Sequence, residues 1–223
     1  LGIDRRAVEQ SMYDILVREV PLEQTLTLTR RVRLDLVPST AQLAGATVEM
    51  VSALARERRL QWALDAVVSR YDYILIDCPP SLGLLTVNGL TAARNGVVIP
   101  VQCEYLALEG LTQLVRTIGL VRKALNPSLR IRGLVMTMFD SRTNLAKQVI
   151  DEVRGHFGTR VFNAVIPRSV RLSEAPSYGE PILSYAPRSS GAKAYQKLTE
   201  ELLAGDGKLS QIRSFMEGSH ATS

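Results

Sequence analysis

Five short apolar runs constrain what this chain can fold into. Four of them are nearly continuous and rich in β-branched residues, and they cover residues 73–76, 96–101, 133–136 and 161–166. Runs of this length without alternation are typical of strands that are buried on both faces. The fifth run, residues 32–38, alternates at period two and ends at a proline, so we predict a strand there as well.

Helical patterns fill the intervals between these runs. Apolar residues recur at helical spacing over residues 111–125, 145–153 and 192–203, and a further helix is expected at residues 84–93. Where strands alternate with helices, each helix can form the long crossover connection that joins two parallel strands. The sequence therefore predicts an α/β fold with a mostly parallel twisted sheet and helices on both faces. We expect one domain over residues 1–204 and a flexible polar tail over residues 205–223.

Charge is distributed unevenly along the chain. Residues 1–115 carry a net charge of −2, whereas residues 116–223 hold 16 basic and 9 acidic residues and carry +7. A basic half suits a polyanionic partner, although an arginine-rich solvated surface would look the same. No apolar run is long enough to span a membrane. Two cysteines without CxxC spacing argue for a reducing, intracellular setting.

The carboxylate that follows the first buried run is a candidate functional residue. Asp77 directly follows residues 73–76, and a carboxylate there can hold Mg²⁺, usually through water, in front of a nucleotide's phosphates. Pro79 and Pro80 end the run and stiffen the next loop, which with Ser81 could sense a γ-phosphate. The alternative is that Asp77 is a turn residue or a helix N-cap.

Several strings of the sequence are familiar. Residues 71–86 read YDYILIDCPPSLGLLT, which closely resembles the Walker B and switch II region of the ParA/Soj family of chromosome- and plasmid-partitioning ATPases. The similarity continues through QCEY at residues 102–105, TMFDSRTNL at residues 137–145 and IPRSVRLSEAPSYG at residues 166–179. It covers about residues 1–204 and is closest to the Soj-type chromosomal branch.

The resemblance implies a function and a set of partners. It implies a P-loop NTPase-like fold, ATP and Mg²⁺ as cofactors, an ATP-dependent homodimer, and a ParB-type partner protein that triggers hydrolysis. It also implies non-specific binding to the DNA of the nucleoid, a cytoplasmic location and no membrane partner. By position, Met138, Pro167 and Arg168 match the nucleotide-binding region, and Arg142 and Arg171 match positions tied to DNA binding.

Each of these last two arginines has a second interpretation. Asp140 lies two residues before Arg142, and Glu174 lies three residues after Arg171. Local ion pairs with these acids are therefore the alternative to phosphate contacts. For one arginine alone, the local ion pair is favoured. For the basic residues taken together, DNA binding is favoured; they are Arg142, Arg168, Arg171, Lys193 and Lys197.

The sequence departs from the family in one respect. No Gly-x-x-x-x-Gly-Lys-Ser/Thr string occurs in the 223 residues, and Leu1-Gly2-Ile3 resembles family sequence that follows the first βαβ unit. We therefore expect the phosphate loop to be missing from this chain, ATP hydrolysis by it to fail, and a central strand to lose its partner. Two alternatives stay open: a non-catalytic adaptor that binds DNA and a partner, and a MinD-like membrane-associated switch.

Overall fold

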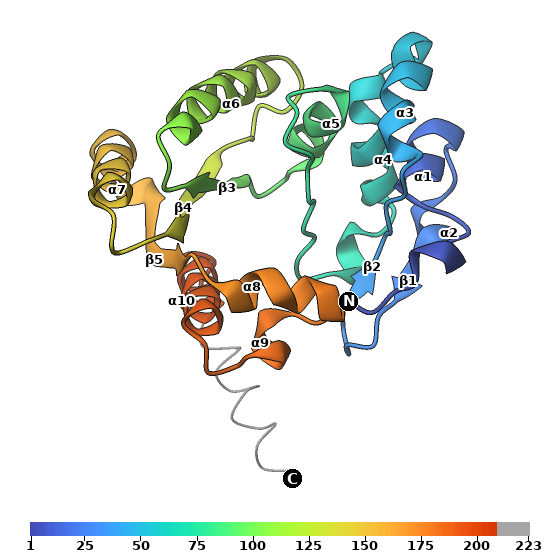
Figure 1. The fold of residues 1–223 in the computed structure, drawn as a ribbon. Helices are drawn as coiled ribbons and strands as arrows, with labels where there is room; N and C mark the ends of the chain where they lie inside the picture. The colour runs from blue at the N-terminus through green and yellow to red at the C-terminus, as the bar shows by residue number, and fades with distance from the viewer. Residues whose placement is uncertain (209–223) are drawn as a thin grey trace. The chain divides into compact units, whose positions relative to one another are not determined.

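The computed structural model describes residues 1–208 (Figure 1). The chain divides into two compact units, Leu1–Val97 with Gly110–Arg132, and Val98–Glu109 with the described residues from Gly133 onward. We refer to them as the first and the second unit. The predicted tail falls outside the described residues from position 209 onward.

The first unit is mainly helical. Its α-helices are α1 (Met12–Arg18), α2 (Leu22–Thr25), α3 (Leu43–Glu49), α4 (Arg59–Asp65) and α5 (Leu84–Ala92), and most of α6 (Leu106–Ala124) belongs to it. Short 3₁₀ turns lie at Arg5–Ala7, Met50–Ser52, Arg56–Arg58 and Val68–Arg70. Its strands are β1 (Thr27–Leu28) and β2 (Asp35–Leu36), which pair in antiparallel fashion.

Two polar side chains tie the helices of the first unit together. The Asn88 amide on α5 donates to the carbonyls of Arg56 and Leu84 at 2.9 and 3.0 Å, and its oxygen accepts the Leu60 N–H at 3.1 Å. Asn126 donates to three carbonyls at the end of α5, among them that of Ala93 at 2.9 Å. Buried amides stabilise a fold when their hydrogen bonds are satisfied in this way.

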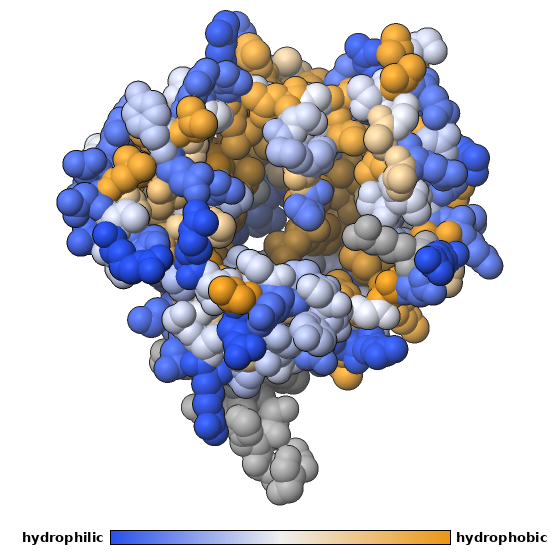
Figure 2. Space-filling model, viewed as in Figure 1, coloured by the Kyte–Doolittle hydropathy of each residue, from blue (hydrophilic) through white to orange (hydrophobic). Residues whose placement is uncertain are grey.

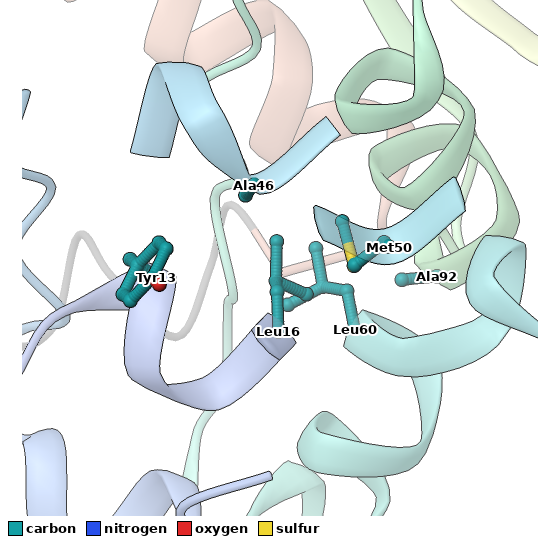
Figure 3. Close-up of a cluster of buried hydrophobic side chains, with 6 residues drawn as sticks. All are labelled: Tyr13, Leu16, Ala46, Met50, Leu60 and Ala92. Carbon is teal, nitrogen blue, oxygen red and sulfur yellow. The ribbon is translucent and has the colours of Figure 1, made fainter. Parts of the chain in front are cut away.

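An apolar cluster forms around these helices (Figure 3). Tyr13 and Leu16 from α1 meet Ala46 from α3 and Leu60 from α4, and Met50, which is 1% exposed, fills the space between them. Helix α1 begins where Ser11 and Asp14 form a capping box, which fixes the direction of its apolar face. Packing of helices therefore holds the first unit together.

The second unit contains the parallel sheet. Its strands are β3 (Val97–Gln102), β4 (Ile131–Phe139) and β5 (Val161–Pro167), in the order β3-β4-β5, and β4 pairs with β5 in parallel. Its helices are α7 (Asn144–Phe157), α8 (Val170–Glu174), α9 (Ile182–Tyr185) and α10 (Ser190–Gly205), with 3₁₀ turns at Gly158–Arg160 and Ala175–Tyr178. This sheet flanked by helices confirms the predicted α/β fold.

The core of the second unit lies between the sheet and its last helix. Val135, Ala164 and Ile166 from β4 and β5 pack against Ala194 and Leu198 from α10. The continuous apolar runs predicted this arrangement, because strands covered by helices carry apolar side chains on both faces. Among the described residues, none of the helices combines the length and hydrophobicity needed to cross a bilayer.

One predicted strand is wrong, and another is shorter than predicted. Residues 73–76 belong to neither described sheet and run without regular structure, with Leu75 92% exposed. Residues 32–38 form only the two-residue β2, whose partner is antiparallel. A strand is stable only when a neighbour accepts and donates its backbone hydrogen bonds, and residues 73–76 have no neighbouring strand in the described part of the chain.

Candidate functional site

Asp77 lies on an exposed connection in the first unit. Asp77, Pro79, Pro80 and Ser81 are all exposed, and the connection ends at α5. The N-cap of α5 is Gly83, so Asp77 does not cap that helix. Its carboxylate is therefore open to solvent and to a ligand.

The connection is anchored to α5 by two contacts. The Thr86 hydroxyl donates to the carbonyls of Ser81 at 2.5 Å and Pro79 at 3.4 Å. Cys78 as a residue is exposed, but its sulfur faces Gly89, where an added Cβ would lie only 2.5 Å from Sγ. Burial of the sulfur and the neighbouring Asp77 raise the pKa of the Cys78 thiol. The loop after Asp77 is thus held in place although it has no strand pairing.

The predicted nucleotide-binding residues gather at the carboxyl ends of β4 and β5. Met138 has a positive φ of 55°, and the register of β4 and β5 shifts between Met136 and Phe139. Pro167 ends β5, and the Arg168 N–H donates to the Phe139 carbonyl at 2.9 Å. A non-glycine residue in the left-handed region costs about 1 kcal/mol, and such strain is concentrated at functional positions.

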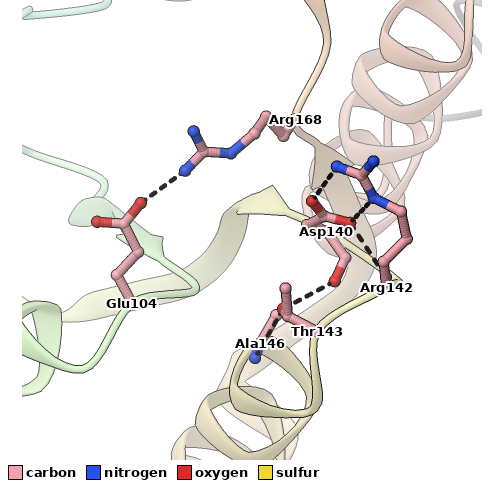
Figure 4. Close-up of polar contacts among 6 residues, drawn as sticks. All are labelled: Glu104, Asp140, Arg142, Thr143, Ala146 and Arg168. Carbon is pink, nitrogen blue, oxygen red and sulfur yellow. Dashed lines mark hydrogen bonds and ion pairs between the residues drawn. The ribbon is translucent and has the colours of Figure 1, made fainter.

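The Arg168 side chain has a partner from a different segment. Its Nη2 lies 2.7 Å from Oε1 of Glu104, which follows β3, and both side chains are about half exposed (Figure 4). Sequence reasoning drew attention to the segment with Glu104 but did not predict this pair. The pair links the ends of β3 and β5, so the three nucleotide-binding candidates lie in one polar region of the second unit.

Arg142 forms a local ion pair. Its Nε and Nη2 donate to Oδ1 and Oδ2 of Asp140 at 2.9 and 2.7 Å, and its backbone N–H donates to Oδ1 at 3.0 Å (Figure 4). These three bonds hold the pKa of the Asp140 carboxyl far below its usual range. The Arg142 side chain is nevertheless 85% exposed. The guanidinium is thus held in a fixed orientation while it remains accessible.

Arg171 belongs to a similar network on α8. Its Nη1 donates to Oε2 of Glu174 at 3.1 Å, and the Tyr185 hydroxyl donates to the same oxygen at 3.0 Å. Hydrogen bonding with Tyr185 and the charge of Glu174 raise the pKa of Arg171. The local pairs weighed from the sequence are therefore present for both arginines, and each guanidinium keeps N–H donors that its carboxylate partner does not use.

The structure brings the candidates together in part. Met138, Arg142, Pro167, Arg168 and Arg171 all belong to the second unit, whereas Asp77 and the loop after it belong to the first. Within the second unit, the ends of neighbouring strands place the nucleotide-binding candidates together, as parallel sheets do.

Comparison with known proteins identifies the family. Residues 1–131 match the model of an AAA domain. The sporulation initiation inhibitor protein Soj of Bacillus subtilis is 56% identical over 204 residues, which cover 92% of this chain and 80% of that protein. This chain belongs to the ParA/Soj family of chromosome-partitioning ATPases. The chromosome partitioning protein ParA of Myxococcus xanthus is 50% identical over 206 residues, 92% of this chain and 72% of that protein.

A solved structure of a related nucleotide-binding protein supports the fold. The cobyrinic acid a,c-diamide synthase of Mycobacterium smegmatis, crystallised with an ATP analogue and magnesium, matches with a TM-score of 0.77. It is 35% identical, and the match covers 91% of this chain and 75% of that one. ParA/Soj proteins thus share their fold with an enzyme that binds ATP and magnesium.

Proposed function

We propose that this chain acts in chromosome partitioning as a nucleotide-controlled protein that binds DNA without sequence preference. Its membership of the ParA/Soj family supports partitioning, and the structural neighbour bound to an ATP analogue and magnesium supports nucleotide control. The observation that carries DNA binding is Arg142, a guanidinium that is oriented by Asp140 and 85% exposed. It lies in the half of the chain that carries a net charge of +7.

Magnesium would bind at Asp77. The carboxylate is exposed, caps no helix and precedes a stiff anchored loop, and a hard oxygen ligand of this kind suits Mg²⁺. The loop offers the Asp77 carboxylate and the Ser81 hydroxyl as side-chain oxygens. The 223 residues contain no glycine-rich phosphate-loop string. Asp77 therefore fits one side of a Mg·ATP site, where the metal would shield phosphate charge. The Pro79–Ser81 loop would respond to the γ-phosphate.

Within the second unit, the ends of β4 and β5 would suit a nucleotide base. Met138 supplies an exposed apolar side chain, Pro167 a rigid apolar ring, and Arg168 a cation that already has Glu104 as a partner. Apolar contacts with a few polar groups are typical of nucleotide-base pockets.

DNA would contact Arg142 and Arg171 through its phosphates. A phosphate presents oxygens in the same forked arrangement as a carboxylate, so it can replace Asp140 or Glu174 without reorienting the guanidinium. Exposed ion pairs stabilise a protein by no more than about 1 kcal/mol, so the exchange costs little. Such contacts give affinity without base specificity.

Family membership also supports two partners. A ParB-type protein and a second copy of the chain would control when DNA is held and released, and the complex would associate with the nucleoid in the cytoplasm. A non-catalytic adaptor is a second candidate, because the sequence has no phosphate-loop string. Titration calorimetry with a non-hydrolysable ATP analogue and Mg²⁺ separates the two. Micromolar affinity would support nucleotide control and exclude the adaptor, whereas the absence of tight binding would favour the adaptor.

DNA binding is tested with three single variants. Arg142→Ala and Arg171→Ala should each weaken binding equally to two unrelated duplexes, and the log–log salt slope should fall by about one unit for each phosphate that is no longer bound. Arg94→Ala is the control, because Arg94 also forms an exposed ion pair, with Asp65, but lies in the acidic half of the chain. Fluorescence anisotropy at several salt concentrations measures the affinities. Wild-type affinity in both candidate variants would contradict the proposal.

A further inference from the structure

The exposed ring of Tyr178 stacks on Tyr185, which shares a hydrogen-bond acceptor with Arg171. Tyr178, which ends the 3₁₀ turn after α8, is 68% exposed, and its ring stacks on Tyr185 of α9 with centroids 5.0 Å apart and planes 24° apart. Since Tyr185 covers one face of the ring while most of Tyr178 stays accessible, the other face is open to solvent. A large aromatic side chain so placed does not contribute to a core.

The stacked pair is held in position from two sides. Gly179, in the left-handed conformation with φ 66°, ends the turn and donates its N–H back to Ala175 and Pro176. The Tyr185 hydroxyl donates to Glu174 Oε2 at 3.0 Å, the oxygen that also accepts from Arg171 at 3.1 Å. The open ring of Tyr178 is therefore connected to the Arg171 guanidinium through Tyr185 and one oxygen of Glu174. A cation and a flat aromatic surface thus belong to one stacked and hydrogen-bonded group.

A cation beside an open aromatic face matches one kind of ligand. Single-stranded nucleic acid presents phosphates and unpaired bases at neighbouring positions, and bases stack on exposed aromatic side chains. A duplex offers phosphates but no open base face. The surface over α8 and α9 is pale to blue in Figure 2 with one apolar spot, so it is not a broad apolar surface.

We propose that Tyr178 stacks on an unpaired base of single-stranded DNA while Arg171 binds an adjacent phosphate. This inference rests on the proposed function only for the phosphate contact of Arg171. It gives the protein a second kind of ligand, DNA with unpaired bases. The first kind is duplex DNA, which the arginines would bind through its phosphates alone.

The test compares oligothymidylate of about 15 nucleotides, within the range of known single-strand site sizes, with a duplex of similar length. Anisotropy of labelled DNA is measured with the full chain and three variants. Tyr178→Ala should weaken binding to oligothymidylate by about five- to 150-fold, the effect of removing one stacked base, and leave duplex binding unchanged. Tyr178→Phe should bind like the wild type. Tyr105→Ala, which removes a tyrosine of similar exposure, 72%, is the control and should bind both DNAs normally.

A second ligand tests the stacking itself. An abasic oligonucleotide of the same length should bind the wild type more weakly than oligothymidylate, and both should bind Tyr178→Ala with equal affinity. Oligothymidylate affinity that is independent of Tyr178, or an equal loss on duplex, overturns the stacking. If the duplex binds and only the stacking fails, the proposed function stands. If oligothymidylate binds through Tyr178 but the duplex does not bind, the proposed function fails instead. If neither DNA binds the wild type, both fail.

Discussion

Two apolar segments of similar composition have opposite structures in this protein. Residues 73–76 are aromatic and aliphatic, and strand β3 is largely aliphatic. Polar residues follow each segment. In β3, Ile99 and Val101 are each 3% exposed and β4 is the neighbouring strand, whereas Leu75 is 92% exposed and no described strand pairs with its segment. The difference shows that β-propensity describes how well side chains suit an existing sheet. The partner strand decides whether the segment joins one.

The polar residues that follow apolar segments are held in place by different kinds of neighbour in the two units. In the second unit, polar side chains after the strands are fixed by neighbours, as Arg168 is by Glu104 and Arg142 by Asp140. In the first unit, the loop after Asp77 is fixed through its contacts with α5. A sheet therefore orients the residues at its strand ends, and a segment outside the sheet depends on a single helix.

The largest expected effect is on stability, from matched substitutions in the sheet and in the unpaired segment. Met136→Ala in β4 removes a side chain that is 0% exposed, and it should lower the free energy of unfolding by about 2–5 kcal/mol. Leu75→Ala should change it by no more than about 0.5 kcal/mol, because an exposed side chain packs against few neighbours. Urea denaturation followed by circular dichroism measures both. Equal losses of stability would mean that Leu75 is buried in solution and that the comparison is wrong.

The sequence predicted the second unit better than the first. Three of its continuous apolar runs form β3, β4 and β5, and the helical spacing matches α7 and α10. These predictions succeeded because each run pairs with a neighbour close in the sequence. The strand at residues 73–76 failed because a run of apolar residues does not show whether a neighbouring strand pairs with it. Helix α1 was overlooked, although its capping box, Ser11 with Asp14, was readable.

The candidate residues could be named from the sequence, but their side-chain pairs could not. The family resemblance identified Met138, Pro167 and Arg168 as nucleotide-binding candidates, and the structure places them at the ends of neighbouring parallel strands. It did not predict that Arg168 pairs with Glu104, 64 residues away in the chain. The stack of Tyr178 on Tyr185 was also missed, because the two rings come from different short elements and no periodic pattern joins them.

A smaller effect on stability tests whether α5 anchors the unpaired segment. In Gly89→Ala the new Cβ would lie 2.5 Å from the sulfur of Cys78, so the segment must shift, and we expect a loss of about 1–3 kcal/mol. Gly155→Ala in α7 meets nothing within 4 Å and should stabilise the protein by about 0.5–1 kcal/mol through helix propensity. In a Cys78→Ala background, Gly89→Ala should lose most of its cost. If Gly89→Ala stabilises the protein as Gly155→Ala does, Cys78 does not pack there.

The smallest effect is a shift in the titration of one carboxyl at the end of β4. Arg142 holds the pKa of Asp140 below its ordinary value through two side-chain hydrogen bonds and one backbone bond. Since the folded-state pKa is lower than the unfolded one, the pair stabilises the fold above about pH 4, and this contribution disappears as the pH falls toward the folded value. The carboxyl-carbon resonance of Asp140, followed by NMR from neutral to acidic pH, should therefore titrate below the ordinary range of an aspartate.

Two variants at the same position separate the causes of that shift. In Arg142→Ala the pKa of Asp140 should move up toward the ordinary range, because the side-chain hydrogen bonds that lower it most are gone. Arg142→Lys should give an intermediate pKa, since an ammonium keeps the charge but not the two-pronged geometry. An ordinary pKa in the wild type would show that the pair is not formed in solution, and Arg142 would then be no better oriented than the residues of the unpaired segment.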